Sequence, residues 1–266
     1  MTPSPAATSP ARSPTPSLRH AFGGVWRLTL PGFLGAGRLL RLVGLLAGLA
    51  LLTLATTRQS NPGQFFDWTI KFYLTFLVPV LAFIAGGGAI RDDLKSETVD
   101  YVFTRPIPRP AFVVFRYVSH LAGLQANCLL ALGTLLGVGL LRQVPGLFAA
   151  VPLLLLAQVL AVGVFTAFGF LCGTLTNRYL IAGMLYAGVV EVGIGAIPTQ
   201  LNRLSLVHHL QVLVQPLTSA ATGNSLPGLG ALPTAALLLF VAATMLAVAA
   251  LLFGFRELAG TRPKEN

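Results

Sequence analysis

Residues 147–176, LFAAVPLLLLAQVLAVGVFTAFGFLCGTLT, contain no charged side chain. A helix needs about 20 mainly apolar residues, each rising 1.5 Å, to cross the hydrocarbon core of a bilayer. This stretch exceeds that length and therefore predicts a transmembrane helix. Five other stretches meet or approach the same length, namely residues 39–56, 72–90, 117–141, 180–197 and 232–255. The sequence predicts an all-α membrane protein with six transmembrane helices.

The composition of the whole chain agrees with this prediction. Of its 266 residues, 55% are apolar and 10% are charged, and the mean hydropathy is +0.77. Soluble globular domains carry roughly 25% charged residues. This excludes a soluble enzyme, a nucleic-acid-binding domain and a disulfide-stapled secreted module. The two cysteines, Cys128 and Cys172, lie inside apolar runs without a neighbouring His or Cys, so no metal site is predicted.

The apolar pattern divides the chain into three parts. Residues 1–17 are rich in Pro, Ser, Thr and Ala and are predicted to be a disordered cytoplasmic tail. Residues 18–256 form the six-helix transmembrane domain, and residues 257–266 a cytoplasmic C-terminal tail. The domain begins with an amphipathic stretch, interrupted at Pro31, that favours an interfacial helix before the first span. A simple basic flank of that span is the alternative.

The basic residues set the orientation. The net charge of +10 would suggest nucleic acid in a soluble protein, but these residues fall mostly between the apolar runs. With six spans, the side that holds both termini carries 14 of the 18 Lys and Arg residues, and the other side carries 4. Because cytoplasmic loops are enriched in Lys and Arg, both termini are predicted to be cytoplasmic, in a multi-pass protein of the plasma or inner membrane.

One cytoplasmic loop, residues 91–116 with the sequence RDDLKSETVDYVFTRPIPRPAFVVFR, is dense in charge. Four of the eight acidic residues of the chain lie here. Basic side chains are interleaved with them, which favours a salt-linked helix face over a metal or acid–base cluster. Residues 92–103 fit a short helix with acidic residues in its first turn, where the helix dipole favours them, and Pro106, Pro108 and Pro110 end it. The loop is thus predicted to be a rigid knob that docks on another protein.

Residues 93–109 of this loop resemble the hallmark loop of ABC-2 type transporter permeases. That loop has an acidic stretch, a threonine, a few apolar residues and a closing Arg-Pro-hydrophobic-x-Arg motif. Here Thr98, residues 101–103 and Arg105-Pro106-Ile107-Pro108-Arg109 match these features, and Glu97 stands where many members have glycine. The pattern Tyr186, Glu191, Pro198 and residues 204–210 is similar to the end of the fifth span and the following external segment of the same family.

The resemblance implies a membrane permease subunit of an ATP-binding cassette exporter, with type V exporter-like architecture. It implies an N-terminal interfacial helix, a cytoplasmic coupling helix and a short external helical segment before the last span. The expected partners are an ABC ATPase on a separate chain, a second permease chain in a homodimer or heterodimer, and membrane lipids, but not nucleic acid. The residues expected to couple to the ATPase are Asp92, Asp93, Glu97, Thr98, Tyr101, Arg105, Pro106 and Arg109.

The chain itself is predicted not to be an enzyme. A P-loop needs the pattern GxxxxGK[ST], and none of the three lysines fits it. ATP and Mg²⁺ are therefore expected on the partner ATPase, with no catalytic residue, metal or cofactor on this chain. An intramembrane enzyme is a weaker alternative, because Ser119 and His120 point about 100° apart on a helix. A non-transporting scaffold that recruits a soluble partner through the same loop is another.

Four polar residues are candidates for a function inside the membrane: Glu191, Gln125, Asn127 and Gln158. Amide side chains within spans commonly bridge helices, so helix packing is favoured over a translocation path. Glu191 is expected to hydrogen-bond backbone or loop donors, with His208, His209 and Arg203 as candidates, in preference to a substrate. In the external segment that follows, residues 201–214 fit a short helix at the outer surface.

Overall fold

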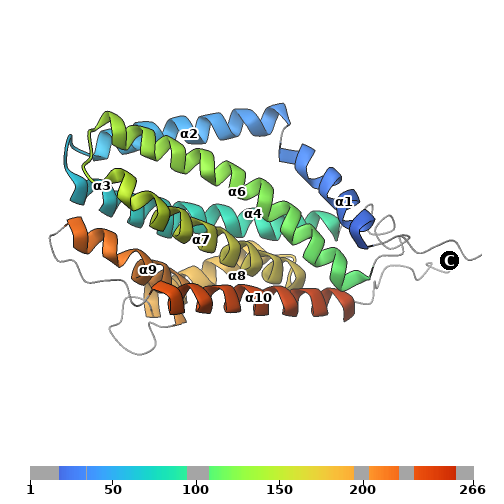
Figure 1. Cartoon of the computed structure of the whole chain (residues 1–266). Coiled ribbons are helices and arrows are strands. Elements are labelled where there is room, and N and C mark those ends of the chain that lie inside the picture. The colour runs from blue at the N-terminus through green and yellow to red at the C-terminus, as the bar shows by residue number, and fades with distance from the viewer. Residues whose placement is uncertain (1–17, 34, 95–107, 195–203, 222–230, 256–266) are drawn as a thin grey trace, which may run out of the picture.

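The computed structural model describes residues 18–33, 35–94, 108–194, 204–221 and 231–255, and every element in these ranges is helical (Figure 1). The α-helices are α1 (Leu18–Thr29), α2 (Ala36–Thr56), α3 (Pro62–Trp68), α4 (Val78–Asp93), α6 (Arg109–Leu141), α7 (Leu147–Leu175), α8 (Tyr179–Tyr186), α9 (Leu206–Ala221) and α10 (Ala231–Phe255). A 3₁₀ helix, η1 (Leu30–Phe33), follows α1, and two π-helical segments, η2 (Thr69–Leu77) and η3 (Ala187–Ile194), follow α3 and α8.

Five of the described helices are long and apolar enough to cross a membrane: Ala36–Thr56, Pro62–Asp93, Arg109–Leu141, Leu147–Leu175 and Leu232–Phe255. Together they confirm the all-helical class and five of the predicted spans, as expected for a multi-pass membrane protein. The other predicted span, 180–197, falls on α8 and η3, which end at Ile194, and residues 195–203 lie outside the described part. The sixth crossing therefore stays a prediction.

The second span begins ten residues before its predicted start at residue 72. Asn61 caps it, because its side chain accepts a hydrogen bond from Gln64 N at 3.0 Å, and Pro62 occupies the first turn, where a missing N–H costs nothing. The helix then widens into η2, in which Val78 N bonds to Tyr73 O, five residues back. Pro79, which has no N–H to donate, follows at once. The span continues through α4 to Asp93 as one long helix.

The most extensive helix pairing in the described bundle is that of α4 with α7, and it depends on glycine. A Cβ on Gly173 would lie 2.8 Å from the carbonyl oxygen of Gly87, and a Cβ on Gly169 would collide with the backbone of Phe83. Small residues four apart let two helix backbones approach in this way. The GxxxG pattern of α7 therefore places α4 against the centre of the bundle, whereas α2 and α10 are the least buried of the five long helices.

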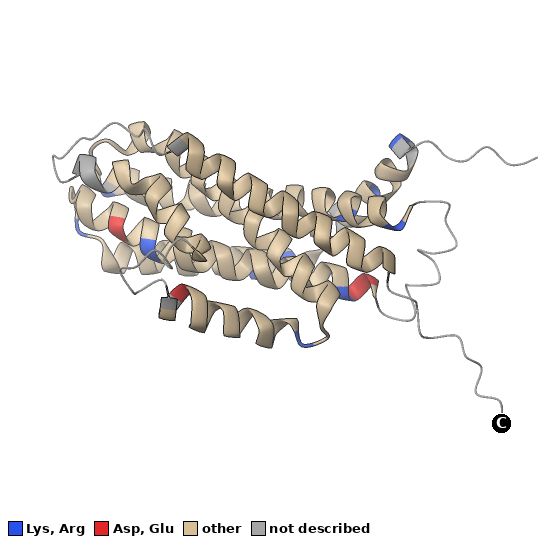
Figure 2. Ribbon diagram, turned by 90° about the horizontal axis from the view of Figure 1, so that it is seen from below, with Lys and Arg blue, Asp and Glu red and all other residues tan. Residues whose placement is uncertain are grey.

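The bundle has two ends, which we call the α1 end and the α3 end (Figure 1). At the α1 end, a buried cluster joins α1, α4, α6, α7 and α10, with Val25, Ile90, Val113 and Phe253 among its members. At the α3 end, α3 contacts α9, and Ser60 N donates to Arg142 O at 2.8 Å. Viewed from below, the acidic residues lie toward these two ends, and the helical stretches between them are mostly uncharged (Figure 2).

Candidate functional site

The candidate site is the base of the charged loop at the α1 end. The loop leaves the bundle at the end of α4, where Leu94 caps the helix, and enters it again at Pro108, the N-cap of α6. Asp92, Asp93 and Arg109 of the predicted coupling residues belong to these two helices. The remaining five, Glu97, Thr98, Tyr101, Arg105 and Pro106, lie outside the described residues, as does most of the predicted coupling helix.

One detail of the prediction is wrong. Residues 92–103 were expected to form a separate helix with Asp92 and Asp93 in its first turn, where the helix dipole favours acidic groups. The structure instead places both residues in the last turn of α4, where the dipole opposes them. The electrostatic reason that this is tolerated at Asp93 is a basic partner on the neighbouring helix.

That partner is Arg116 of α6. Arg116 Nε lies 2.7 Å from Asp93 Oδ2, and the two side chains are only 19% and 10% exposed. Arg116 also donates from Nη1 to Thr29 Oγ1 at 2.7 Å, and Thr29 in turn donates to Val25 O at 2.8 Å. A single buried guanidinium therefore joins the end of α4, the first turns of α6 and the end of α1.

Apolar contacts surround this polar junction. The ring of Phe22 on α1 meets Phe115 on α6 edge to face, with centroids 5.5 Å apart, and Phe112 lies against Phe253 of α10. On α1, Val25 is buried while Arg19 and Arg27 are exposed, as expected for an amphipathic helix. The base of the loop is thus a packed junction of three helices.

Within the bundle, Gln158 bridges helices. It is fully buried on α7, and its Oε1 accepts a hydrogen bond from Tyr73 of η2 at 2.6 Å. The same hydroxyl lies 2.8 Å from the carbonyl oxygen of Cys128 on α6. Tyr73 therefore connects three helices at this point, and its contacts are those of a packing residue.

The other two amide candidates both lie on α6, partly buried. Neither amide atom of Gln125 has a hydrogen-bond partner among the described residues, and Asn127 lies two residues further on. In the same helix, Ser119 Oγ and His120 Nε2 likewise lack partners within the described ranges, so these two atoms are not hydrogen-bonded to each other. The structure brings none of these residues together with Gln158 or Glu191 through a hydrogen bond that we observe.

Glu191, in the middle of η3, binds the start of α9. Its carboxylate accepts hydrogen bonds from Leu206 N at 3.1 Å, from Val207 N at 3.2 Å, and from the hydroxyls of Tyr186 and Ser205. Ser205 is itself the cap of α9, because its Oγ accepts from His208 N at 2.9 Å. The donors are thus backbone and hydroxyl groups; Arg203 lies outside the described residues. A carboxylate at a helix N-terminus is favourably placed with respect to the helix dipole.

Sequence reasoning missed three residues of these sites: Arg116 and Thr29 at the loop base, and Tyr73 in the bundle. A basic residue and a hydroxyl near span ends carry no signal for pairing across 87 residues of sequence. Tyr73 did carry a signal, since a phenol inside an apolar run needs a hydrogen-bond partner. No protein-family model matches the chain, and no curated protein is similar to it in sequence.

Proposed function

We propose that this chain is the permease subunit of an ATP-binding cassette transporter of the ABC-2 type. It exports a substrate across the cytoplasmic membrane, and a separate ATPase subunit binds ATP and Mg²⁺ and supplies the energy. The observation that carries the proposal is the three-helix junction of Asp93, Arg116 and Thr29 at the base of the charged loop. A loop that transmits force to the helices needs a rigid base.

The junction gives the loop a mechanical role. A push from the ATPase on residues 95–107 reaches α4 through Asp93 and α6 through Arg109. Because Arg116 ties both helices to α1, the three move together, and α7 follows α4 through the glycine contact. Interfaces of this kind transmit rigid-body motion better than they deform.

The path of the chain supports six crossings. Helix α7 runs toward the α1 end, where Gly173 packs on Gly87 and Ile90 of α4, and α8 begins at Tyr179, four residues after α7 ends. Glu191 then binds α9, which contacts α3 at the opposite end, and α10 returns to place Phe253 beside Phe112. In this proposal α8 and η3 are the fifth of six spans. The exposed faces of α2 and α10 are left for lipid or for the second permease chain.

The test is co-purification of the detergent-solubilised chain with candidate ABC ATPases encoded nearby. The double variant Arg105→Glu/Arg109→Glu is expected to weaken retention of the ATPase by at least about tenfold, because like charges then meet at the interface. Arg58→Glu, an exposed charge reversal in the turn between α2 and α3, is the matched control and is expected to retain the ATPase.

Two results would contradict the proposal. If the double variant retained the ATPase at the wild-type level, the loop would not be part of the interface. If the wild type retained no ATPase, the chain would have no subunit to supply the energy for transport. A scaffold that uses the same loop would also lose its partner in the double variant. It differs in that no transported compound changes the ATPase rate of the complex.

A further inference from the structure

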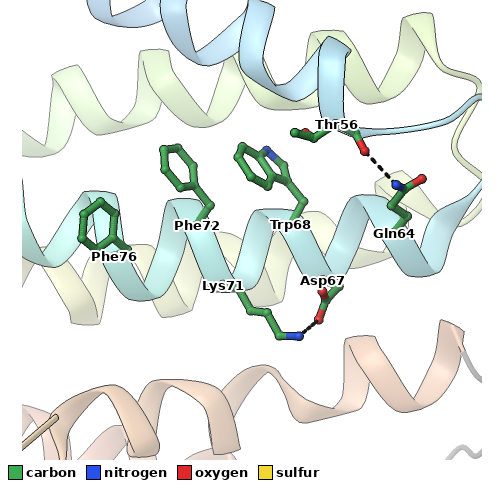
Figure 3. Close-up of a pocket in the computed structure, with 7 residues that line it drawn as sticks. All are labelled: Thr56, Gln64, Asp67, Trp68, Lys71, Phe72 and Phe76. Atoms are coloured by element: carbon green, nitrogen blue, oxygen red, sulfur yellow. Dashed lines mark hydrogen bonds and ion pairs between the residues drawn. The ribbon is translucent and has the colours of Figure 1, made fainter. Parts of the chain in front are cut away.

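The helix of residues 62–93 carries a stripe of aromatic rings near the α3 end. Trp68 and Phe72 stack with their planes 11° apart and their centroids 4.5 Å apart, and Phe76 follows with its centroid 5.9 Å from that of Phe72. The three rings point to the same side of the helix, toward α2 (Figure 3). They line an open pocket of about 440 Å³ together with Asp67 and Lys71.

Asp67 and Lys71 form an exposed ion pair on the side of the helix that faces α9 (Figure 3), and they also line the aromatic pocket. Lys71 Nζ lies 2.7 Å from Asp67 Oδ1, and the side chains remain 72% and 52% exposed. Both residues also line a second pocket, of about 360 Å³, whose other wall is the polar side of α9 with His208, Gln211 and Gln215. The ion pair therefore separates an aromatic groove from a polar one.

The depth of these residues in a membrane follows from the length of the helix. Its 32 residues extend about 48 Å, whereas the hydrocarbon core is about 30 Å thick, so about 9 Å at each end stands in the headgroup region when the helix is centred. That boundary falls near Trp68, at the depth where tryptophan is enriched in membrane proteins. Asp67 then lies at headgroup level. The backbone of Lys71 lies one turn deeper, with Nζ reaching back to within 2.7 Å of Asp67 Oδ1, and Phe72 and Phe76 lie against the acyl chains.

The pocket is held in shape before any ligand binds. Trp68 donates from Nε1 to Thr53 Oγ1 at 3.1 Å, which fixes the indole against α2. Gln64 donates to Thr56 O at 2.7 Å (Figure 3). It also accepts from Arg58 N at 3.0 Å, and the two hydrogen bonds fix the rim. Preorganisation of this kind reduces the entropy lost on binding.

We propose that this surface is a binding site for a zwitterionic phospholipid. The acyl chain lies along the aromatic stripe, the phosphate meets Lys71, and the ammonium group meets Asp67. In such a lipid the phosphate lies deeper than the ammonium group, which is the order of Lys71 and Asp67 along the helix from the boundary inward. An anionic lipid without the ammonium group would leave Asp67 facing its phosphate. The inference requires only that this helix crosses a membrane, and it does not depend on transport.

The test uses the fluorescence of Trp68 in the full-length chain. The chain has two tryptophans, so Trp26→Phe leaves Trp68 as the only one. The protein is placed in bilayers that contain phosphatidylcholine or phosphatidylglycerol brominated on the upper part of one acyl chain, since bromine quenches a tryptophan that it contacts. From the quenching of Trp68 we expect the apparent affinity of the site for phosphatidylcholine to be about threefold higher than that for phosphatidylglycerol. This ratio is typical of exposed ion contacts.

The deciding variant exchanges the two charges, Asp67→Lys/Lys71→Asp. It keeps the composition and the ion pair but places the carboxylate at phosphate depth, so we expect the preference for phosphatidylcholine to disappear. Asp67→Asn, which removes the carboxylate that faces the ammonium group, is a second variant with the same expected result, and circular dichroism checks that each remains helical. Equal quenching of the unexchanged protein by both lipids would overturn the proposal. So would a preference that survives the exchange, or a Trp68 that neither lipid quenches because a second copy of the chain covers it.

Discussion

At the scale of single residues, Arg116 holds more of the structure together than its place in the sequence indicates. It is a buried cation that pairs with Asp93 and also donates to Thr29, so its removal leaves a carboxylate buried without a counterion. The pair itself contributes little net stability, because both groups lose their hydration on burial. The junction therefore fixes the relative positions of three helices. Removal of one charged partner is expected to destabilise the protein, whereas removal of both is not.

This reasoning predicts an asymmetric result for the ion pair. Arg116→Met is expected to lower the free energy of unfolding by about 3–5 kcal/mol, because Asp93 is left unpaired. The double variant Arg116→Met/Asp93→Leu removes both charges and is expected to recover most of that loss. Denaturation of the detergent-solubilised protein, followed by circular dichroism, measures both values. If the double variant were as unstable as the single one, the carboxylate would not be the cause.

Glu191 gives a second prediction at this scale. Glu191→Gln replaces one carboxylate oxygen with an NH₂ group, which cannot accept the hydrogen bonds from the backbone N–H groups of α9. We therefore expect the first turn of α9 to lose about 1–3 kcal/mol of protection from hydrogen exchange. Hydrogen exchange of the peptide that covers residues 204–221, read by mass spectrometry, measures this loss. Tyr186→Phe removes only one of the donors and serves as the matched control, with a smaller expected change. Unchanged protection in Glu191→Gln would mean that Ser205 alone caps the helix.

At the scale of helices, the sequence predicts the positions of the spans well, because hydropathy determines them. It predicts poorly the features that depend on contacts between side chains of different helices. The long apolar runs gave the positions of five spans, since a lipid environment leaves a helix as the only option for such a run. The start of the second span at Pro62 was missed, because Asp67 and Lys71 interrupt the apolar pattern even though they do not interrupt the helix. The π-helical form of η2 could not be predicted, because the sequence has no periodic pattern that indicates it. The same holds for the partners of Arg116.

The pairing of α4 with α7 leads to a prediction about glycine. Gly169→Ala is expected to destabilise the bundle, because the new methyl group would meet the backbone of Phe83, which cannot move aside without shifting α4. Gly133→Ala on α6 is the control, since a Cβ there meets nothing within 4 Å, and alanine favours the helix by roughly 1 kcal/mol. Thermal unfolding in detergent should therefore move in opposite directions for the two variants. A shift of the same sign and size in both would argue against close backbone contact at Gly169.

At the scale of the whole molecule, the number of crossings decides where each loop functions. The five long helices alone would leave the two termini on opposite sides of the membrane, and a sixth crossing by α8 and η3 would bring them to the same side. The distribution of Lys and Arg favours the second arrangement, because it gathers 14 of these 18 residues on the cytoplasmic side. Only in that arrangement does the charged loop share a compartment with both tails.

Single cysteines distinguish the two arrangements. Both native cysteines are buried, so Cys128→Ala/Cys172→Ala gives a background without reactive thiols. In whole cells treated with a membrane-impermeant maleimide, six crossings predict that Asn224→Cys is labelled while Asn177→Cys and Asn266→Cys are protected until the cells are opened. Without a crossing by α8 and η3, Asn224→Cys would be protected and Asn266→Cys labelled. Arg58→Cys, in the exposed turn before α3, is labelled in either case and confirms that the reagent reaches the outer surface.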